Sequence, residues 1–273
     1  MDAHAETARH RLTAMIALVL TIAVGALTFA ATAPAGAQPT TRPTAAKEAA
    51  SQAREATVTG GVNLRPCVDL GRSVCSPVGT TGSTASATMR CWRDGSTATG
   101  AYTSNRWFLM LLADSREGFV HSSYVRNQNG VPNCNTLPYV RAADYALGLV
   151  GQVYAASSLA SRYTDWAPGP YAEWSGDCAK LTHASWVYGA GASYANGNAI
   201  VQYRYYRDRG MIYGGLPRFG EPVFYNIAAP YGHTAIYVGG TTIVSTQGMD
   251  GSRLPVVRRD INSFGNYLGW ARL

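Results

Sequence analysis

Residues 217–239 read PRFGEPVFYNIAAPYGHTAIYVG and hold the pattern that decides the fold of the C-terminal half. Two runs rich in β-branched and aromatic residues, Glu221–Tyr225 and Thr234–Val238, are separated by a short segment with alanine, proline and glycine. This composition predicts two neighbouring strands joined by a short connection. His233 stands at the start of the second strand, where a sheet can present an imidazole across a cleft.

Helical patterns come first and strand patterns later across residues 138–273. Apolar residues recur at helical spacing in Tyr139–Tyr154, and again from Leu181 toward the glycines at 189 and 191. Beyond the two strands already described, strand-like runs continue to the end of the chain: Thr242–Ser245, Leu254–Arg258 and Tyr267–Arg272. Helices followed by an antiparallel sheet predict an α+β domain.

Residues 60–137 have a different pattern, in which short apolar runs are separated by Gly, Asp or Asn at intervals of about ten residues. Such spacing is typical of a small all-β barrel. The runs are Val62–Leu64, Pro77–Gly79, Thr88–Trp92, Arg106–Leu112 and Glu117–Tyr124. His121 lies in the last run, and we expect it to be a hydrogen-bonded structural residue rather than a catalytic one. The predicted fold is a small barrel followed by an α+β domain.

The first 37 residues are typical of a secretion signal. Two arginines precede an apolar run over Met15–Ala30, and Ala35-Gly36-Ala37 forms an A-x-A cleavage site. We therefore expect residues 1–37 to be removed and the protein to be secreted, with retention as a membrane anchor as the alternative. Residues 38–59 are polar, with prolines first, which predicts a linker.

Composition limits the partners of the protein. With 47% hydrophobic and 14% charged residues, the chain of 273 residues is not a disordered polyelectrolyte. The net charge of +7 is spread along the chain without a run of five like charges, which argues against a nucleic-acid partner. A diffuse positive field suits an anionic matrix such as a bacterial cell wall, although solubility alone explains it equally well. We expect the mature protein to be a monomer without stable membrane insertion.

Five cysteines fall at positions 67, 75, 91, 134 and 178. Exported proteins meet oxidising conditions, and an odd cysteine there suggests a reactive thiol or an intermolecular bridge. We expect two disulfides in the N-terminal domain, with Cys178 remaining a thiol. Three pairings of the first four cysteines are open. We favour Cys67–Cys75, which closes a local loop, together with Cys91–Cys134, which joins the start of that domain to its end.

Cys178 follows Gly176-Asp177, a turn and capping pair, so it should lie in the first turn of a helix. A helix N-terminus favours a thiolate, and a thiolate beside an imidazole is the pair needed for acyl transfer. His183 is five positions further along the same helix and near its opposite side, which favours a packing role. His233, at a strand end, is the better partner. The chain has no C-x-x-C or H-x-x-x-H spacing and no nucleotide-binding glycine motif, so we expect neither a metal nor a cofactor.

These residues resemble the NlpC-type cell-wall peptidases, a papain-like family with a cysteine on a helix and a histidine on the sheet. The matching segments are A-L-G-L-V-G-Q-V-Y at 146–154, D-C at 177–178, P-R-F-G-E-P-V-F-Y at 217–225 and G-H-T-A-I-Y-V-G at 232–239. The resemblance implies that Cys178 is the nucleophile, that His233 is the general base and that Tyr154 is a cleft tyrosine near the oxyanion site.

The family's third polar residue, which orients the imidazole, falls at Ser245, 12 positions after the histidine. Gln247 lies two residues further on the same strand face and offers an amide acceptor as the alternative. We expect Trp174 and Asp177, which precede the nucleophile, to contact the substrate. Besides the serine at the third polar position, which is a weaker acceptor than His, Asn or Gln, two departures from the family pattern occur: A-K instead of S-G at 179–180, and G-E instead of G-D at 220–221.

The barrel resembles a bacterial SH3-like domain in V-N-L-R at 62–65, W-F-L-M-L-L at 107–112 and E-G-F-V-H-S-S-Y-V at 117–125. In that family the domain often binds cell-wall peptide. The two resemblances together imply a secreted peptidoglycan hydrolase that cleaves an amide bond in the stem peptide or the crosslink by a Cys–His mechanism. Three alternatives stay open: an N-acetylmuramoyl-L-alanine amidase of the related CHAP class, a non-catalytic wall-binding protein, and a secreted toxin acting on other cells.

Overall fold

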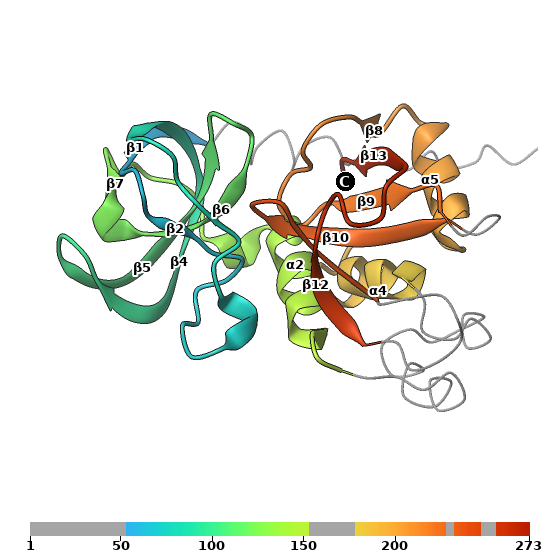
Figure 1. The fold of residues 1–273 in the computed structure, drawn as a ribbon, viewed down its shortest axis with the longest axis horizontal. Coiled ribbons are helices and arrows are strands. Elements are labelled where there is room, and N and C mark those ends of the chain that lie inside the picture. Colours follow the sequence, from blue (N-terminus) through green and yellow to red (C-terminus); the bar gives the residue numbers. More distant parts are fainter. Residues whose placement is uncertain (1–52, 153–177, 228–231, 247–254) are drawn as a thin grey trace, which may run out of the picture. The chain divides into compact units, whose positions relative to one another are not determined.

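Two antiparallel sheets, a short two-stranded ribbon and three α-helices make up the described part of the chain (Figure 1). The computed structural model describes residues 53–152, 178–227, 232–246 and 255–273. The mixed α and β class predicted from the sequence is confirmed. Within these ranges, no helix has the length and apolar character needed to cross a membrane.

The N-terminal part is built of strands, as predicted. They are β1 (Arg54–Val58), β2 (Asn63–Leu64), β3 (Gly79–Thr80), β4 (Ala85–Thr99), β5 (Thr103–Leu112), β6 (Glu117–His121) and β7 (Val125–Arg126). Five of them form one sheet in the order β6-β5-β4-β1-β7, and β2 pairs with β3. In β4, alternate side chains such as Met89 and Cys91 are buried, because successive residues of a strand point to opposite faces. The SH3-like class of this part stays a prediction.

Strand β1 lies inside residues 38–59, which the sequence pattern assigned to a linker. It pairs with β4 on one side and with β7 on the other, and its Ala56 and Val58 side chains are buried. Two apolar residues in a polar stretch give too few alternations to be recognised as a strand. The sheet therefore begins at Arg54 rather than at residue 60.

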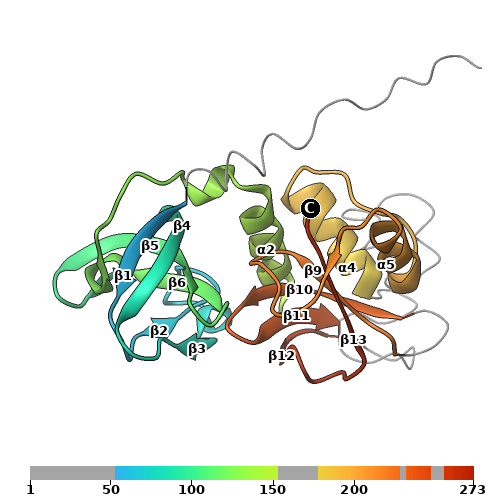
Figure 2. The ribbon, with the colours of Figure 1, turned by 90° about the horizontal axis from the view of Figure 1, so that it is seen from above.

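The C-terminal part holds a six-stranded sheet in the order β12-β11-β10-β9-β13-β8. Its elements are α2 (Pro138–Leu149), α4 (Cys178–Ala184), α5 (Ala199–Arg207), β8 (Ile212–Tyr213), β9 (Pro222–Tyr225), β10 (His233–Gly239), β11 (Thr242–Thr246), β12 (Val256–Asp260) and β13 (Tyr267–Ala271). All five strands predicted here are present, whereas α5 and β8 were not predicted. Helices α2, α4 and α5 all contact β10, and Figure 2 shows them beside that strand.

The first and second helices differ in how well their ends were predicted. Helix α2 ends at Leu149, earlier than the predicted end at Tyr154. Gly151 has a φ of +86°, a left-handed conformation that ends a helix, and its N–H donates to the carbonyl of Val256 at 2.9 Å. Helix α4 continues through a π-helical turn to Gly189, where the glycine pattern placed its end.

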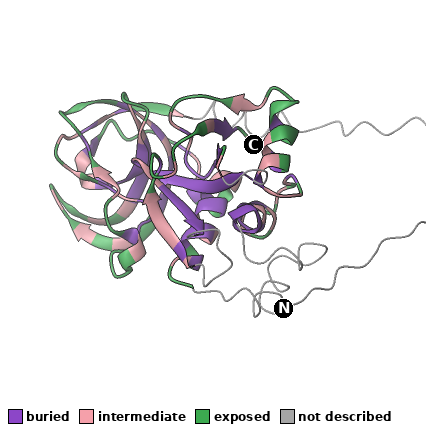
Figure 3. Ribbon diagram, turned by 45° about the vertical axis from the view of Figure 1, so that its right-hand side comes forward, coloured by how far each residue is buried: buried purple, intermediate pink, exposed green. Residues whose placement is uncertain are grey.

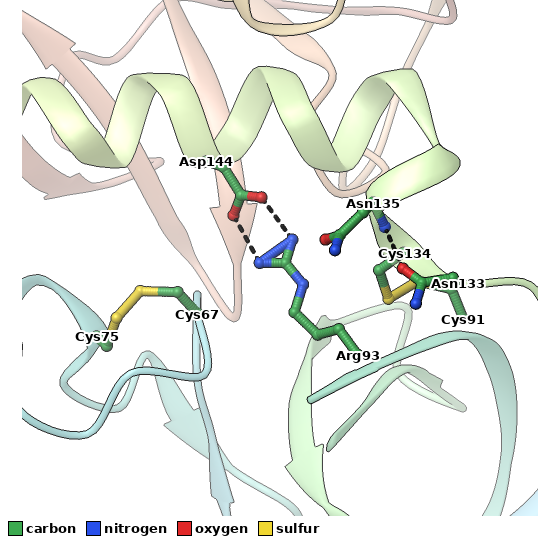
Figure 4. A network of polar contacts seen from close by, with 8 residues as sticks. All are labelled: Cys67, Cys75, Cys91, Arg93, Asn133, Cys134, Asn135 and Asp144. Atoms are coloured by element: carbon green, nitrogen blue, oxygen red, sulfur yellow. Dashed lines mark hydrogen bonds and ion pairs between the residues drawn. A yellow bond between two sulfur atoms is a disulfide. The ribbon is translucent and has the colours of Figure 1, made fainter. Parts of the chain in front are cut away.

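Contacts join the first sheet to the elements that follow it. Both guanidinium NH₂ groups of Arg93 in β4 donate to the carboxylate of Asp144 in α2, at 3.0 and 2.5 Å (Figure 4). Glu117 in β6 is 1% exposed, and its carboxylate pairs with Arg90 at 3.3 Å and accepts the N–H of Phe219 at 2.6 Å. Buried residues, purple in Figure 3, therefore form a core that includes side chains from both sheets.

The two predicted disulfides are confirmed. Cys67 is bonded to Cys75, and Cys91 in β4 is bonded to Cys134 just before α2 (Figure 4). His121 is also structural, as predicted, because its two ring nitrogens bond to the Ser123 hydroxyl at 2.8 Å and to the Ser104 carbonyl at 3.0 Å.

Candidate active site

Cys178 is the first residue of α4 and takes no part in either disulfide. It therefore lies in the first turn of a helix, as the turn and capping pair before it predicted. The residue is 6% exposed, and α4 packs against β10 and β11. These two strands carry the other two polar residues of the predicted triad that the structure describes.

His233 and Ser245 are brought together by the pairing of β10 with β11. Ile236 lies opposite Val244 in this antiparallel pair, which places Ser245 on the same sheet face as His233. Nε2 of the imidazole lies 2.7 Å from the Ser245 hydroxyl oxygen, and the histidine is 1% exposed. The Nδ1 atom is buried and makes no hydrogen bond to any described residue. One ring nitrogen is therefore held, and the other is left for a partner.

Aromatic rings and one cation surround the imidazole. The ring centroid of Phe264 lies 4.2 Å from that of His233, and the ring of Tyr225 in β9 lies 6.2 Å away. The guanidinium of Arg259 in β12 lies over the Phe264 ring, 5.3 Å from its centroid. Burial, with a smaller contribution from the charge of Arg259, lowers the pKa of His233 to about 4. The imidazole is therefore neutral at physiological pH and can accept a proton.

Polar contacts also fix the helix that carries Cys178. The side chain of Gln202 in α5 is buried, and its amide nitrogen donates to the carbonyl of Ala179 at 3.1 Å. The hydroxyl of Thr182 lies 3.0 Å from the same carbonyl, 3.3 Å from the carbonyl of Cys178 and 3.2 Å from the amide oxygen of Gln202. The first turn of α4 is thus bonded to α5 as well as packed on the sheet.

The remaining predicted site residues fall into two groups. Tyr154, Trp174, Asp177 and Gln247 lie outside the described residues, so their roles stay predictions. His183 is a structural residue: it packs against Tyr194 with ring centroids 6.1 Å apart and bonds to the backbone of Ala195.

Both departures from the family pattern are buried. Lys180 is 2% exposed in α4. Glu221 is 1% exposed, and its carboxylate accepts the N–H of Leu273 at 3.1 Å. Burial raises the pKa of Glu221 well above its ordinary value. The second position therefore keeps an acidic residue, and its burial favours the neutral form.

The residues that sequence reasoning missed contact the candidate site after folding. They are Phe264 and Arg259 beside the imidazole, Tyr194 and Gln202 beside α4, and Thr182 within α4. One local feature of the sequence could have indicated the helix that carries Gln202. Asn198 is a capping residue, and its side chain caps α5 by accepting the N–H of Val201 at 3.1 Å. No cluster of three or more potential metal ligands occurs among the residues that the structure describes.

Comparison with known proteins gives distant structural similarity and no sequence match. No family model and no curated protein matches the chain. The solved structure of NlpC2 from Trichomonas vaginalis is 14% identical, with 81% of this chain and 74% of that chain covered and a TM-score of 0.33. NlpC1 from the same organism is 12% identical, with 81% and 69% covered and a TM-score of 0.35. An NlpC/P60 family protein from Bacillus cereus is 12% identical, with 83% and 66% covered and a TM-score of 0.30. At these scores the argument for a site rests on the residues themselves.

Proposed function

We propose that the protein is a secreted hydrolase that cleaves an amide bond in bacterial cell-wall peptide, with Cys178 as nucleophile and His233 as general base. One observation carries the proposal. The imidazole is held at Nε2 by Ser245, while its buried Nδ1 has no partner among the described residues. A nucleophile and a base oriented by a third group are the constellation that acyl transfer requires.

The protonation state of the imidazole fits this role. Since its pKa is low, His233 starts neutral, and the mechanism requires the tautomer with the proton on Nε2 and a lone pair on Nδ1. The Nε2–H then donates to the hydroxyl oxygen of Ser245. That hydroxyl keeps its own hydrogen for the carbonyl of Thr246 at 3.3 Å or of Thr234 at 3.4 Å. Ser245 can therefore hold the required tautomer although it is a hydroxyl and not an amide or an imidazole.

The reaction follows in two steps. Nδ1 of His233 takes the thiol proton of Cys178 as the sulfur attacks the substrate carbonyl carbon, and the backbone N–H of Cys178 contributes to binding the oxyanion. The amide C–N bond breaks when the imidazolium returns the proton to the leaving amine, which leaves a thioester. Water then attacks the thioester, His233 accepts a proton from it, and the carboxylate product and the thiol are released.

Three further features support a cell-wall substrate outside the cell. Two disulfides suit an oxidising compartment. The net charge of +7 favours attraction to an anionic matrix, and the all-β part in front of the site would hold wall peptide if it is SH3-like. Peptidoglycan is therefore the proposed partner, with neither a nucleic-acid partner nor a cofactor proposed.

The test is hydrolysis of purified cell walls, followed as loss of turbidity. Cys178→Ala and His233→Ala should each lower the rate by at least about a hundredfold, because neither a thiol nor an imidazole acts alone in this mechanism. His183→Ala is the matched control, a histidine on the nucleophile helix that should keep most of the activity. Wall binding without hydrolysis by the parent protein would refute the proposal in favour of a binding protein. Mass spectrometry of the products separates cleavage within the peptide from cleavage at the N-acetylmuramoyl-L-alanine bond.

A further inference from the structure

A buried group of polar side chains links the helix of Cys178 to the strand of His233, and the mechanism above does not use it. Its centre is Tyr194, which lies between α4 and α5 and packs edge-on against the ring of His183. The tyrosine hydroxyl donates to the amide oxygen of Gln202 at 3.4 Å. The side chains of Thr182 in α4 and Thr234 in β10 face the same hydroxyl and partly offset the effect of burial on its pKa.

These contacts reach both halves of the proposed catalytic pair. Thr234 is the residue directly after His233, and its hydroxyl donates to the carbonyl of Val223 in the neighbouring strand β9 at 2.8 Å. Thr182 lies one helical turn after Cys178 and within 3.3 Å of its carbonyl oxygen. The Tyr194 hydroxyl therefore lies beside one neighbour of each reacting residue, Thr182 for Cys178 and Thr234 for His233.

Gln202 completes the group, and both of its amide hydrogens are used. Its amide nitrogen donates to the carbonyls of Ala179 and Gly197, each at 3.1 Å, and its amide oxygen faces Thr182 at 3.2 Å and Tyr194 at 3.4 Å. The Thr182 hydroxyl has one hydrogen, which the amide oxygen shares with the backbone carbonyls of α4. Buried polar contacts of this kind favour one arrangement of their elements over others.

We propose that Tyr194, Gln202 and Thr182 form a brace that sets the position of Cys178 relative to His233, and that they are positioning residues for the hydrolysis. The inference depends on the proposed function only for the second of the two measurements described below, the rate of wall hydrolysis. A displacement of about 1 Å between reacting groups can lower turnover about a hundredfold, so a brace of a few hydrogen bonds can matter for rate while contributing little to folding. Burial raises the pKa of Tyr194 well above its ordinary value, so its hydroxyl stays a neutral donor over the working range.

The test compares Tyr194→Phe with Tyr206→Phe. Both substitutions remove one hydroxyl and keep the ring, and the two rings are neighbours with centroids 5.5 Å apart. The Tyr206 hydroxyl accepts the N–H of Ala195 at 2.9 Å and takes no part in the hydrogen bonds of Gln202 and Thr182. Tyr206→Phe therefore reports the general effect of losing a hydroxyl in this region, and thermal unfolding of both variants shows that each is folded.

The first readout is the pH profile of iodoacetamide labelling at Cys178, followed by mass spectrometry, which needs no substrate. Because the neutral imidazole of His233 accepts the thiol proton as the sulfur attacks the reagent, a displaced imidazole slows labelling, and the profile of Tyr194→Phe should lie about tenfold below that of the parent between pH 6 and pH 8. The second readout is wall hydrolysis, where kcat should fall at least about tenfold with KM nearly unchanged. Tyr206→Phe should stay within about twofold of the parent in both measurements.

Thr182→Val supplies a second variant of equal size that removes the contact on the other side of Tyr194. The double variant should lose less than the product of the two single effects, because the residues act through one network. The brace is refuted if Tyr194→Phe and Tyr206→Phe have the same labelling profile and the same kcat. Hydrolysis that persists in Cys178→Ala would refute the proposed function instead, since labelling of the thiol does not depend on it.

Discussion

The imidazole of His233 should stay neutral to a much lower pH than an ordinary histidine. Its ring is 1% exposed between Phe264 and Tyr225, and Ser245 supplies a hydroxyl instead of a carboxylate that would stabilise the charged form. Arg259 adds a positive charge nearby, and together with burial lowers the pKa to about 4. At pH 5.5 an imidazole with that pKa is about 97% neutral, whereas one with an ordinary pKa of about 6.5 is only about 9% neutral.

The measurement is NMR titration of the imidazole in Cys178→Ala, where no thiol can share the proton. The His233 resonances, assigned by their loss in His233→Gln, should titrate near pH 4, and in the parent enzyme kcat/KM at pH 5.5 should remain close to its value at pH 7. The substitution Arg259→Gln tests the second cause of the lowered pKa, the positive charge near the imidazole. It should raise the pKa by about half a unit to one unit, less than burial contributes, because the substitution leaves the ring buried.

The same shift predicts a loss of stability in acid. Since the folded pKa lies below the unfolded one, the unfolded chain binds more protons between about pH 6.5 and pH 4, so stability is fully present above that window and falls as pH decreases through it. A difference of about 2.5 units corresponds to about 3 kcal/mol. In urea unfolding, His233→Gln should lack this part of the acid destabilisation. A titration midpoint of His233 at pH 6 or above would refute the reasoning, because it would require a charge-stabilising partner that the site does not contain among its described residues.

Two further predictions concern residues at positions 220 and 221. The first is that Glu221→Gln becomes more stable relative to the parent as pH rises from 4.5 to 8. The folded state raises the pKa of the buried carboxyl, so the parent loses free energy of unfolding as pH increases toward that pKa, whereas the amide does not titrate. Urea unfolding of both proteins at both pH values measures the difference. Gly220→Ala should destabilise the fold by about 2–4 kcal/mol in the same assay. Gly220 has a φ of +78°, and an added Cβ would overlap the carbonyl oxygen of Tyr139 in α2.

Five of the six strands of the second sheet could be predicted because they are rich in β-branched and aromatic side chains, whereas β8 has only two residues. Helix α5 could not, because the three positions it buries are Ala199, Gln202 and Tyr206. A helical period is recognised from apolar residues on one face, and here the central buried residue is an amide that is inside for its hydrogen bonds. Gln202 therefore accounts for both observations. It ties α5 to α4 by hydrogen bonds, and because it is polar it interrupts the apolar period from which α5 could have been predicted.

The candidate site likewise has a part that could be predicted from the sequence and a part that could not. Cys178 and His233 are proposed from their sequence context and Ser245 from the family resemblance, and the pairing of β10 with β11 joins the last two directly. The environment of the imidazole was not predictable, because Phe264 and Arg259 reach it from a later strand and the turn after it. A sequence pattern can therefore propose candidate site residues, while the pKa of His233 depends on contacts that exist only after the sheet has formed.

The sequence pattern changes near residue 137, where strands are followed by a helix, but the residues on the two sides of this position remain in contact. Arg93 and Glu117 on the N-terminal side bond to Asp144 and to the backbone of Phe219 on the other side. The carbonyl of Glu117 also accepts the N–H of Gly240, at the tight turn between β10 and β11 that sets the register of His233 against Ser245. Since that turn is held from the first sheet, the geometry of the imidazole and its orienting hydroxyl depends in part on residues more than a hundred positions earlier in the chain.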